Sequence, residues 1–193
     1  MVKSIPALLV ALRFLIGPFL LWDALDGQTS QGFIIAFIVA FLSDIFDGII
    51  ARRLGVSTAK LRQADSWADV CLYVCIAYSA WQVHREIVLS FQWPLLSVVF
   101  IQLVWWVVNL IKYGQPASYH TYSAKLWGLT LFAATVAMFG FNYAGIALWL
   151  AIIVGFIHTM EEIAMTLILP QWTHDVLSIF HALKLRDRGS ASP

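Results

Sequence analysis

Four aspartates fall inside or beside apolar stretches of this chain, where a lipid bilayer is the expected surrounding. Asp44 and Asp47 lie near the end of one stretch, and Asp65 and Asp69 lie near the start of the next. An ionised carboxylate in a membrane is costly, so such residues usually face a partner or a water-filled cavity. On a helix, i, i+3 spacing puts the first pair within about 60° and i, i+4 spacing puts the second within about 40°. Each helix therefore presents two carboxylates on one face.

Two such faces together predict a site for divalent metal ions. Hard cations such as Mg²⁺, Mn²⁺ or Ca²⁺ prefer oxygen ligands, and two metals held close together assist the displacement of a leaving group at phosphorus. We therefore predict that Asp44, Asp47, Asp65 and Asp69 are metal ligands and that the chemistry is phosphoryl transfer in a membrane. A proton or cation relay in a transporter is the alternative that the carboxylates alone leave open.

The composition is that of an integral membrane protein. Of the 193 residues, 61% are apolar and 12% are charged, against about 45–50% and about 25% in soluble domains. A net charge of +1 gives no argument for a nucleic-acid partner. Cys71 and Cys75 share one apolar stretch, which favours small buried hydrophobes over a disulfide or a metal site.

Six stretches approach or exceed the roughly 20 apolar residues that a spanning helix needs. They are 5–23, 31–53, 66–84, 90–112, 124–142 and 144–169. The sequence therefore predicts an all-α membrane protein with six transmembrane helices and a single domain over residues 1–193. The first stretch is long, contains Arg13 and has no small-residue cleavage site after it, which favours a retained helix over a signal peptide.

The basic residues predict the orientation, because Lys and Arg prefer cytoplasmic loops. With the N-terminus inside, six spans leave only Arg85 on the outer side, and Lys3 joins the other basic residues at or near the cytoplasmic side. Both termini and the aspartates then face the cytoplasm. After Pro170, the spacing of apolar residues predicts a short cytoplasmic surface helix. Its basic residues would face anionic head groups; they are Lys184, Arg186 and Arg188.

The segment from Asp44 to Asp69 also carries an ordered pattern, DIFDGIIARRLGVSTAKLRQADSWAD. It resembles the signature of the CDP-alcohol phosphotransferase (CDP-alcohol phosphatidyltransferase) family, D-x2-D-G-x2-A-R-x8-G-x3-D-x3-D. Seven of the eight defining positions match, and Leu61 stands where the family has its second glycine. The first stretch resembles the first-helix pattern of phosphatidylglycerophosphate synthase and its relatives through Pro6, Arg13 and Pro18.

This resemblance implies transfer of a phosphatidyl group from CDP-diacylglycerol to an alcohol acceptor, with release of CMP, in phospholipid biosynthesis. It implies Mg²⁺ or Mn²⁺, two ions per site, held by the four aspartates, and Asp69 as the base that deprotonates the acceptor hydroxyl. Donor-binding residues are implied at Gly48, Ala51 and Arg52. We expect a homodimer in the plasma membrane of a bacterium, with the active site facing the cytoplasm.

The donor residues also make chemical sense by themselves. Gly48 and Ala51 leave a small-residue groove beside the acidic face, and the planar fork of Arg52 suits phosphate oxygens. Helix packing through small residues, with Arg52 marking the membrane boundary, is the alternative. The bulk of Leu61 leaves open a narrowed cytidine pocket, an altered donor preference or an inactive relative.

No local motif identifies the acceptor. The weaker candidates for acceptor binding, in the loop before the fifth predicted span and at its start, are His120, Ser123 and Lys125; a solvated loop is the alternative. Glu161 and Glu162 lie inside the sixth span, with His158 one turn earlier, where they line a polar cavity or stabilise a helix interface.

Three other functions stay open. One is transfer of a phosphoalcohol from a CDP-alcohol to diacylglycerol. The others are an ion-coupled transporter, and a catalytically inactive membrane interaction protein, which the departure at Leu61 favours.

Overall fold

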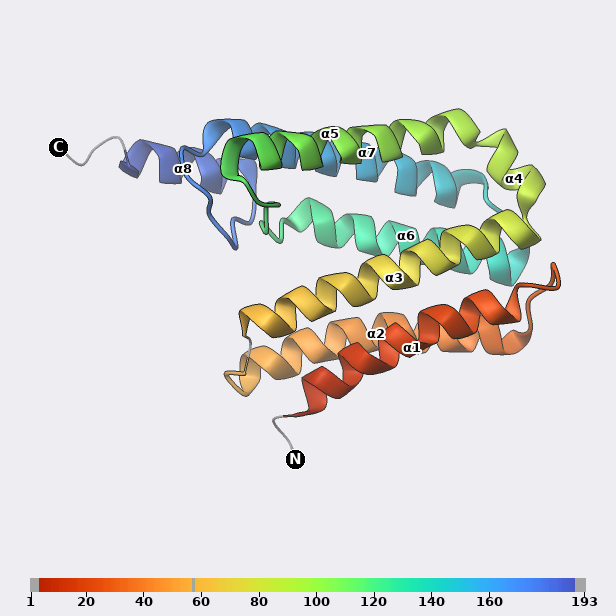
Figure 1. The fold of residues 1–193 in the computed structure, drawn as a ribbon. Coiled ribbons are helices and arrows are strands. Elements are labelled where there is room, and N and C mark those ends of the chain that lie inside the picture. Colours follow the sequence, from red (N-terminus) through yellow and green to blue (C-terminus); the bar gives the residue numbers. More distant parts are fainter. Residues whose placement is uncertain (1–3, 57, 190–193) are drawn as a thin grey trace. The chain divides into compact units, whose positions relative to one another are not determined.

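The computed structural model describes residues 4–56 and 58–189, and its regular structure in this range is helical (Figure 1). In chain order the helices are α1 (Ile5–Asp23), α2 (Gln31–Arg53), α3 (Ala59–Val83), α4 (Arg85–Ser90), α5 (Gln92–Tyr113), α6 (Tyr122–Phe141), α7 (Gly145–Ile168) and α8 (Ile179–Gly189). The all-helical fold class is as predicted.

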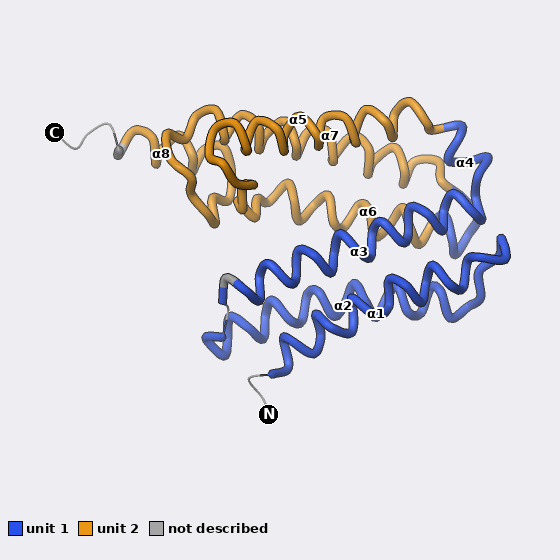
Figure 2. The backbone as a smooth tube through the Cα atoms, in the orientation of Figure 1, with its two compact units in different colours: residues 1–90, 138–143 blue, residues 91–137, 144–193 orange. Residues whose placement is uncertain are grey.

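The chain forms two compact units (Figure 2). Unit 1 consists of residues 1–90 and 138–143, and unit 2 consists of residues 91–137 and 144–193. Unit 1 therefore holds the aspartate motif, and unit 2 holds the candidate acceptor residues. The single membrane domain over 1–193 stays a prediction.

Five helices of the described chain are long and apolar enough to cross a membrane: α1, α2, α5, α6 and α7. Their ends fall within two residues of five of the predicted stretches. Hydropathy works well here because the apolar run and the helix coincide. These helices support an integral membrane protein.

The structure differs from the prediction at the third helix. The helix α3 begins at Ala59, about two turns before the predicted start of that span, and it is not among the five apolar helices. Its start is set by a cap, because the Thr58 hydroxyl oxygen accepts a hydrogen bond from the Leu61 N–H at 3.2 Å. Polar residues in its first turns hid this start from the apolar pattern; they include Lys60, Arg62, Asp65 and Asp69.

In unit 1, α1 packs against both α2 and α3 (Figure 1). On α1 the buried residues recur at helical spacing along one face: Pro6, Val10, Arg13, Ile16, Gly17 and Leu20. On α2 the same spacing runs through Phe33, Phe37, Ala40, Ser43, Asp47 and Ala51. One stripe on each helix therefore buries apolar residues and a charged residue together.

The helices α1 and α3 approach each other closely at Gly17. A Cβ at this position would lie 3.3 Å from the Leu72 Cα and 3.5 Å from the Cys71 carbonyl oxygen. Backbone atoms cannot swing aside as the end of a flexible side chain can. The missing side chain therefore sets the spacing of the two helices one turn from Arg13. Cys75 is buried, as predicted, whereas Cys71 is half-buried.

In unit 2, polar side chains join α5 to α7. Gln102 Nε2 donates to Thr159 Oγ1 at 2.9 Å, and seven residues further along both helices Thr166 Oγ1 lies 3.1 Å from Asn109 Oδ1. Lys112 Nζ donates to the Thr166 carbonyl at 2.8 Å, near the end of α7 where carbonyls lack partners in the helix. These pairs fix the register of the two helices.

The segment before α8 lies along the loop that precedes α6. The Asp175 N–H donates to the Ser118 carbonyl, and the Tyr122 N–H donates to the Leu177 carbonyl, both at 3.0 Å. Val176 is buried in a cluster with Tyr119, Met165, Leu169 and Ala182. This segment is thus anchored to unit 2 by its own backbone. Within α8, Lys184 and Arg186 are exposed, as a surface helix requires; Lys3 and the side chain of Arg188 lie outside the described residues.

Candidate active site

The guanidinium of Arg13 lies among the four aspartates and is fully buried. Its Nη1 is 2.9 Å from Asp44 Oδ1 and 2.9 Å from Asp65 Oδ1. Nη1 also contacts Asp69, and Nη2 contacts Asp47. Side chains from α2 and α3 therefore meet on a single side chain of α1.

Three of the four aspartates, without Asp69, have oxygens close enough together to share a metal ion. One carboxylate oxygen from each of Asp44, Asp47 and Asp65 lies within 4.8 Å of the others. An all-oxygen donor set of this kind fits Mg²⁺ or Mn²⁺. Asp47 is 6% exposed, whereas the other three side chains are between 32% and 42% exposed. The cluster is therefore closed on the Asp47 side and open to a ligand elsewhere.

The predicted donor residues continue the same face of α2. Ala51 is buried, and Arg52 is exposed. A Cβ at Gly48 would lie 3.3 Å from Arg52 Nη1, because the Arg52 side chain folds back one turn. The guanidinium thus lies over the glycine that follows Asp47.

Leu61, the departure from the motif, lies in the first turn of α3 and is half-buried. Leucine favours a helix over glycine by about 1 kcal/mol in a helix interior. Leucine at this position is therefore compatible with the helix. We expect it to affect the binding of a ligand beside this turn.

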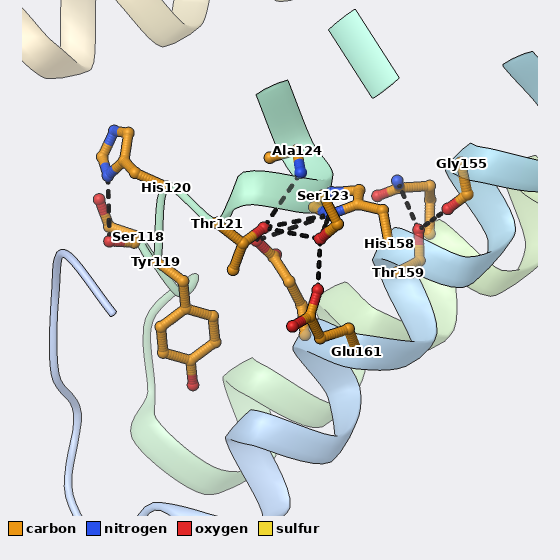
Figure 3. Close-up of polar contacts among 12 residues, drawn as sticks. Ser118, Tyr119, His120, Thr121, Ser123, Ala124, Gly155, His158, Thr159 and Glu161 are labelled. Atoms are coloured by element: carbon orange, nitrogen blue, oxygen red, sulfur yellow. Dashed lines mark hydrogen bonds and ion pairs between the residues drawn. The ribbon is translucent and has the colours of Figure 1, made fainter. Parts of the chain in front are cut away.

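The structure gives the three candidate acceptor residues separate surroundings. His120 Nδ1 lies 3.2 Å from Asp175 Oδ1, on a left-handed backbone with φ 57°. The ammonium of Lys125 lies 5.4 Å from the centre of the Tyr122 ring. Of the three, Ser123 faces a cluster of polar side chains (Figure 3).

That cluster joins α6 to α7. Ser123 Oγ donates to Glu161 Oε2 at 2.5 Å and lies 3.3 Å from His158 Nδ1. Thr121 Oγ1 lies 3.4 Å from both His158 Nδ1 and Glu162 Oε1. Figure 3 shows Thr121 and Ser123 turned toward the α7 side chains. His158 and Glu162 are both buried.

Glu161 has a second partner beyond this cluster. Its Oε1 accepts a hydrogen bond from the Ile179 N–H, at the first residue of α8, at 3.1 Å. This geometry favours the helix-interface role over the cavity-lining role for Glu161.

In the neighbouring loop, burial raises the pKa of the Tyr119 phenol, which stays protonated and lies 3.0 Å from Thr166 Oγ1.

The comparison with known families identifies the family of the chain. The family model described as CDP-alcohol phosphatidyltransferase matches residues 3–157. The chain belongs to the CDP-alcohol phosphatidyltransferase family. No curated protein and no solved structure is significantly similar to the chain.

Family membership fixes the general chemistry. CDP-alcohol phosphatidyltransferases are transferases that move a phosphatidyl or phosphoalcohol group from a CDP-linked donor, typically with divalent metal ions. The match includes Arg13 and all four aspartates, and it ends before Glu161, Glu162 and the C-terminal segment. The family match therefore does not extend to the Glu161 contacts with α6 and α8, which are known from this structure.

Sequence reasoning missed Arg13 as the partner of the aspartates in this family member. A signal was present, because Arg13 is the single charged residue between Ile5 and Trp22. A buried arginine needs carboxylate partners, and the four motif aspartates are the nearest group of carboxylates in the predicted membrane region. The contacts of Thr121 had no comparable signal.

Proposed function

We propose that this protein transfers a phosphatidyl group from CDP-diacylglycerol to an alcohol acceptor and releases CMP. Family membership supports a CDP-linked donor. The observation that carries the proposal is the set of four aspartates gathered around a buried cation and open on one side. Such a site suits a diphosphate bound through divalent ions.

Asp44, Asp47, Asp65 and Asp69 would hold Mg²⁺ or Mn²⁺, two ions in all, which supply charge neutralisation for the diphosphate and for departing CMP. Arg52 would hydrogen-bond phosphate oxygens, and Gly48 and Ala51 would let the nucleotide approach α2. Leu61 would lie at the nucleotide side of the site. These assignments use the positions that match the family pattern.

Asp69 would act as the general base. The acceptor hydroxyl gives its proton to the Asp69 carboxylate while its oxygen forms a bond to the phosphorus of the phosphatidyl group. The bond from that phosphorus to the bridging oxygen breaks, and CMP leaves with the bonding electrons. The side chain of Asp69 is 39% exposed, so an acceptor can reach it. One carboxylate can both position the acceptor hydroxyl and accept its proton.

The acceptor side is proposed to include His120, Ser123 and Lys125. A Lys125 contact with a phosphorylated acceptor would be ionic, whereas His120 and Ser123 would contact it through hydrogen bonds. Alanine variants at these positions should then raise the KM for the acceptor and leave the KM for the donor unchanged.

We further propose that α3 also crosses the membrane, as the third of six spans. Its polar first turns would lie at the cytoplasmic surface, which places the aspartates there and both termini inside. The helix α8 would then lie on the cytoplasmic surface. A homodimer in a bacterial plasma membrane completes the proposal.

The test is CMP release by the full-length protein in lipid nanodiscs containing CDP-diacylglycerol. Glycerol 3-phosphate, inositol phosphate and serine are supplied singly as acceptors, and the lipid products are identified by mass spectrometry. We expect CMP and one new phospholipid with one acceptor, and loss of both in Asp44→Asn. A second set of nanodiscs holds diacylglycerol and receives a CDP-linked amino alcohol. CMP release only in this second set would overturn the proposed direction of transfer.

A further inference from the structure

Arg13 lies outside the aspartate motif in sequence but at the centre of its side chains in space. Four carboxylates from two helices lie within 4.0 Å of its guanidinium nitrogens. Among the described arginines and lysines, Arg13 is the residue that forms ion pairs with all four aspartates. The Arg13 Nε is buried without a hydrogen-bond partner, so the guanidinium is held through its two Nη atoms.

Arg13 and the aspartate cluster each need opposite charge close by, and each supplies it to the other. A fully buried guanidinium has lost its hydration and needs nearby negative charge. Four carboxylates gathered in one place repel each other and need nearby positive charge. The arginine and the aspartates therefore form one electrostatic unit, although they come from three helices.

We propose that Arg13 is the counter-ion that holds the four aspartates together before a divalent cation binds, and that the cation competes with it for carboxylate oxygens. This inference rests on the proposed metal site. Asp44 and Asp65, two of the three aspartates that fit a metal ion, are each 2.9 Å from Nη1. A metal ion draws on the same negative charge that binds the guanidinium, and the two cations repel each other.

Binding of the metal and ion pairing of Arg13 are therefore negatively coupled. Coupling between two equilibria is reciprocal. Where the aspartates keep their places in the helices, removing Arg13 should therefore strengthen metal binding, because the competing cation is gone. Arg13 then tunes metal affinity as a positioning residue, and it takes no part in bond making.

The first test is Mn²⁺ binding to the full-length protein in nanodiscs, measured by electron paramagnetic resonance of free Mn²⁺. We expect Arg13→Gln to bind Mn²⁺ about tenfold more tightly than the wild type. The matched control is Arg53→Gln, which removes an exposed arginine near the end of α2 and should leave Mn²⁺ affinity unchanged. Unchanged or weaker Mn²⁺ binding by Arg13→Gln overturns the proposal.

The second test is thermal stability with and without metal. In chelator, Arg13→Gln should melt at a lower temperature than the wild type, and saturating Mn²⁺ should remove most of the difference. An equal loss of stability in both conditions assigns Arg13 a packing role and overturns the competition. If Arg13→Gln does not fold, Arg13→Lys replaces it. Lysine keeps the charge without the fork, so Mn²⁺ affinity should exceed that of the wild type by a smaller factor; equal affinity overturns the proposal.

The same experiment separates this inference from the proposed function. If the wild type binds no Mn²⁺, the proposed metal site is wrong, and so is the competition. If the wild type binds Mn²⁺ and Arg13→Gln binds it with the same affinity, the metal site stands and only the role proposed for Arg13 is overturned.

Discussion

Glu161 on α7 accepts a hydrogen bond from the N–H of Ile179, the first residue of α8, at 3.1 Å. Its other carboxylate oxygen accepts the Ser123 hydroxyl of α6. One side chain therefore joins three helices, and its negative charge lies at the positive end of the α8 dipole.

Glu161→Ala should loosen α8 without unfolding the rest of unit 2. Losing the carboxylate leaves the Ile179 N–H without its partner, which costs about 1–3 kcal/mol locally. Amide hydrogen exchange of residues 179–187 should become faster by about tenfold or more. Glu86→Ala, which removes an exposed glutamate from α4, is the control and should leave this exchange unchanged. Equal protection of α8 in Glu161→Ala and the wild type contradicts the role of the carboxylate.

Gly17→Ala should destabilise unit 1. The new methyl group meets the Leu72 backbone at 3.3 Å, and α1 must move away from α3. Overpacking of this kind costs about 1–3 kcal/mol, which thermal melting in nanodiscs will detect. Gly128→Ala is the matched control, because a Cβ there meets nothing within 4 Å. Its melting temperature should stay the same or rise. A Gly17→Ala protein as stable as the wild type shows that the close approach does not set the helix spacing.

Leu61→Gly tests the departure from the family pattern. If the leucine side chain narrows the nucleotide site, its removal should increase affinity for CDP-diacylglycerol. The first turn of α3 loses up to about 1 kcal/mol of helix propensity, and the Thr58 cap remains because it bonds the backbone N–H of residue 61. Leu61→Ala keeps the helix propensity and should give part of the same gain. Unchanged or poorer donor binding in folded variants counts against a narrowed pocket.

The sequence predicts the apolar helices and the meeting of the aspartates for the same physical reason. Apolar runs report where a helix can lie in lipid, and carboxylates such as Asp47 in such runs must share a polar site. The start of α3 was placed too late because it depends on the Thr58 cap and not on hydropathy. The isolated charge of Arg13 in an apolar stretch signals that it needs carboxylate partners, whereas the burial of Val176 depends on which loops pack together, and no local pattern specifies that. The roles of His120 and Lys125 stay predictions.

Asp69→Asn should separate binding from turnover. Asparagine keeps the shape of the side chain but cannot accept the hydroxyl proton, so CMP release should fall by about 10²–10⁴-fold. Affinity for the cytidine donor should fall much less. Asp44→Asn, measured in the same membranes, should weaken metal and donor binding together. Near-normal turnover in Asp69→Asn removes that residue from the mechanism.

The most direct test of the account is the dependence of CMP release on divalent metal. Full-length protein in CDP-diacylglycerol nanodiscs, with its acceptor present, is assayed in strong chelator and after addition of Mg²⁺ or Mn²⁺. We predict that CMP release is lost in chelator and returns with either ion. In the proposed mechanism, Asp44, Asp47 and Asp65, whose oxygens lie within 4.8 Å of one another, would provide ligands for the ions that hold the diphosphate. Full CMP release in the presence of chelator would contradict the account.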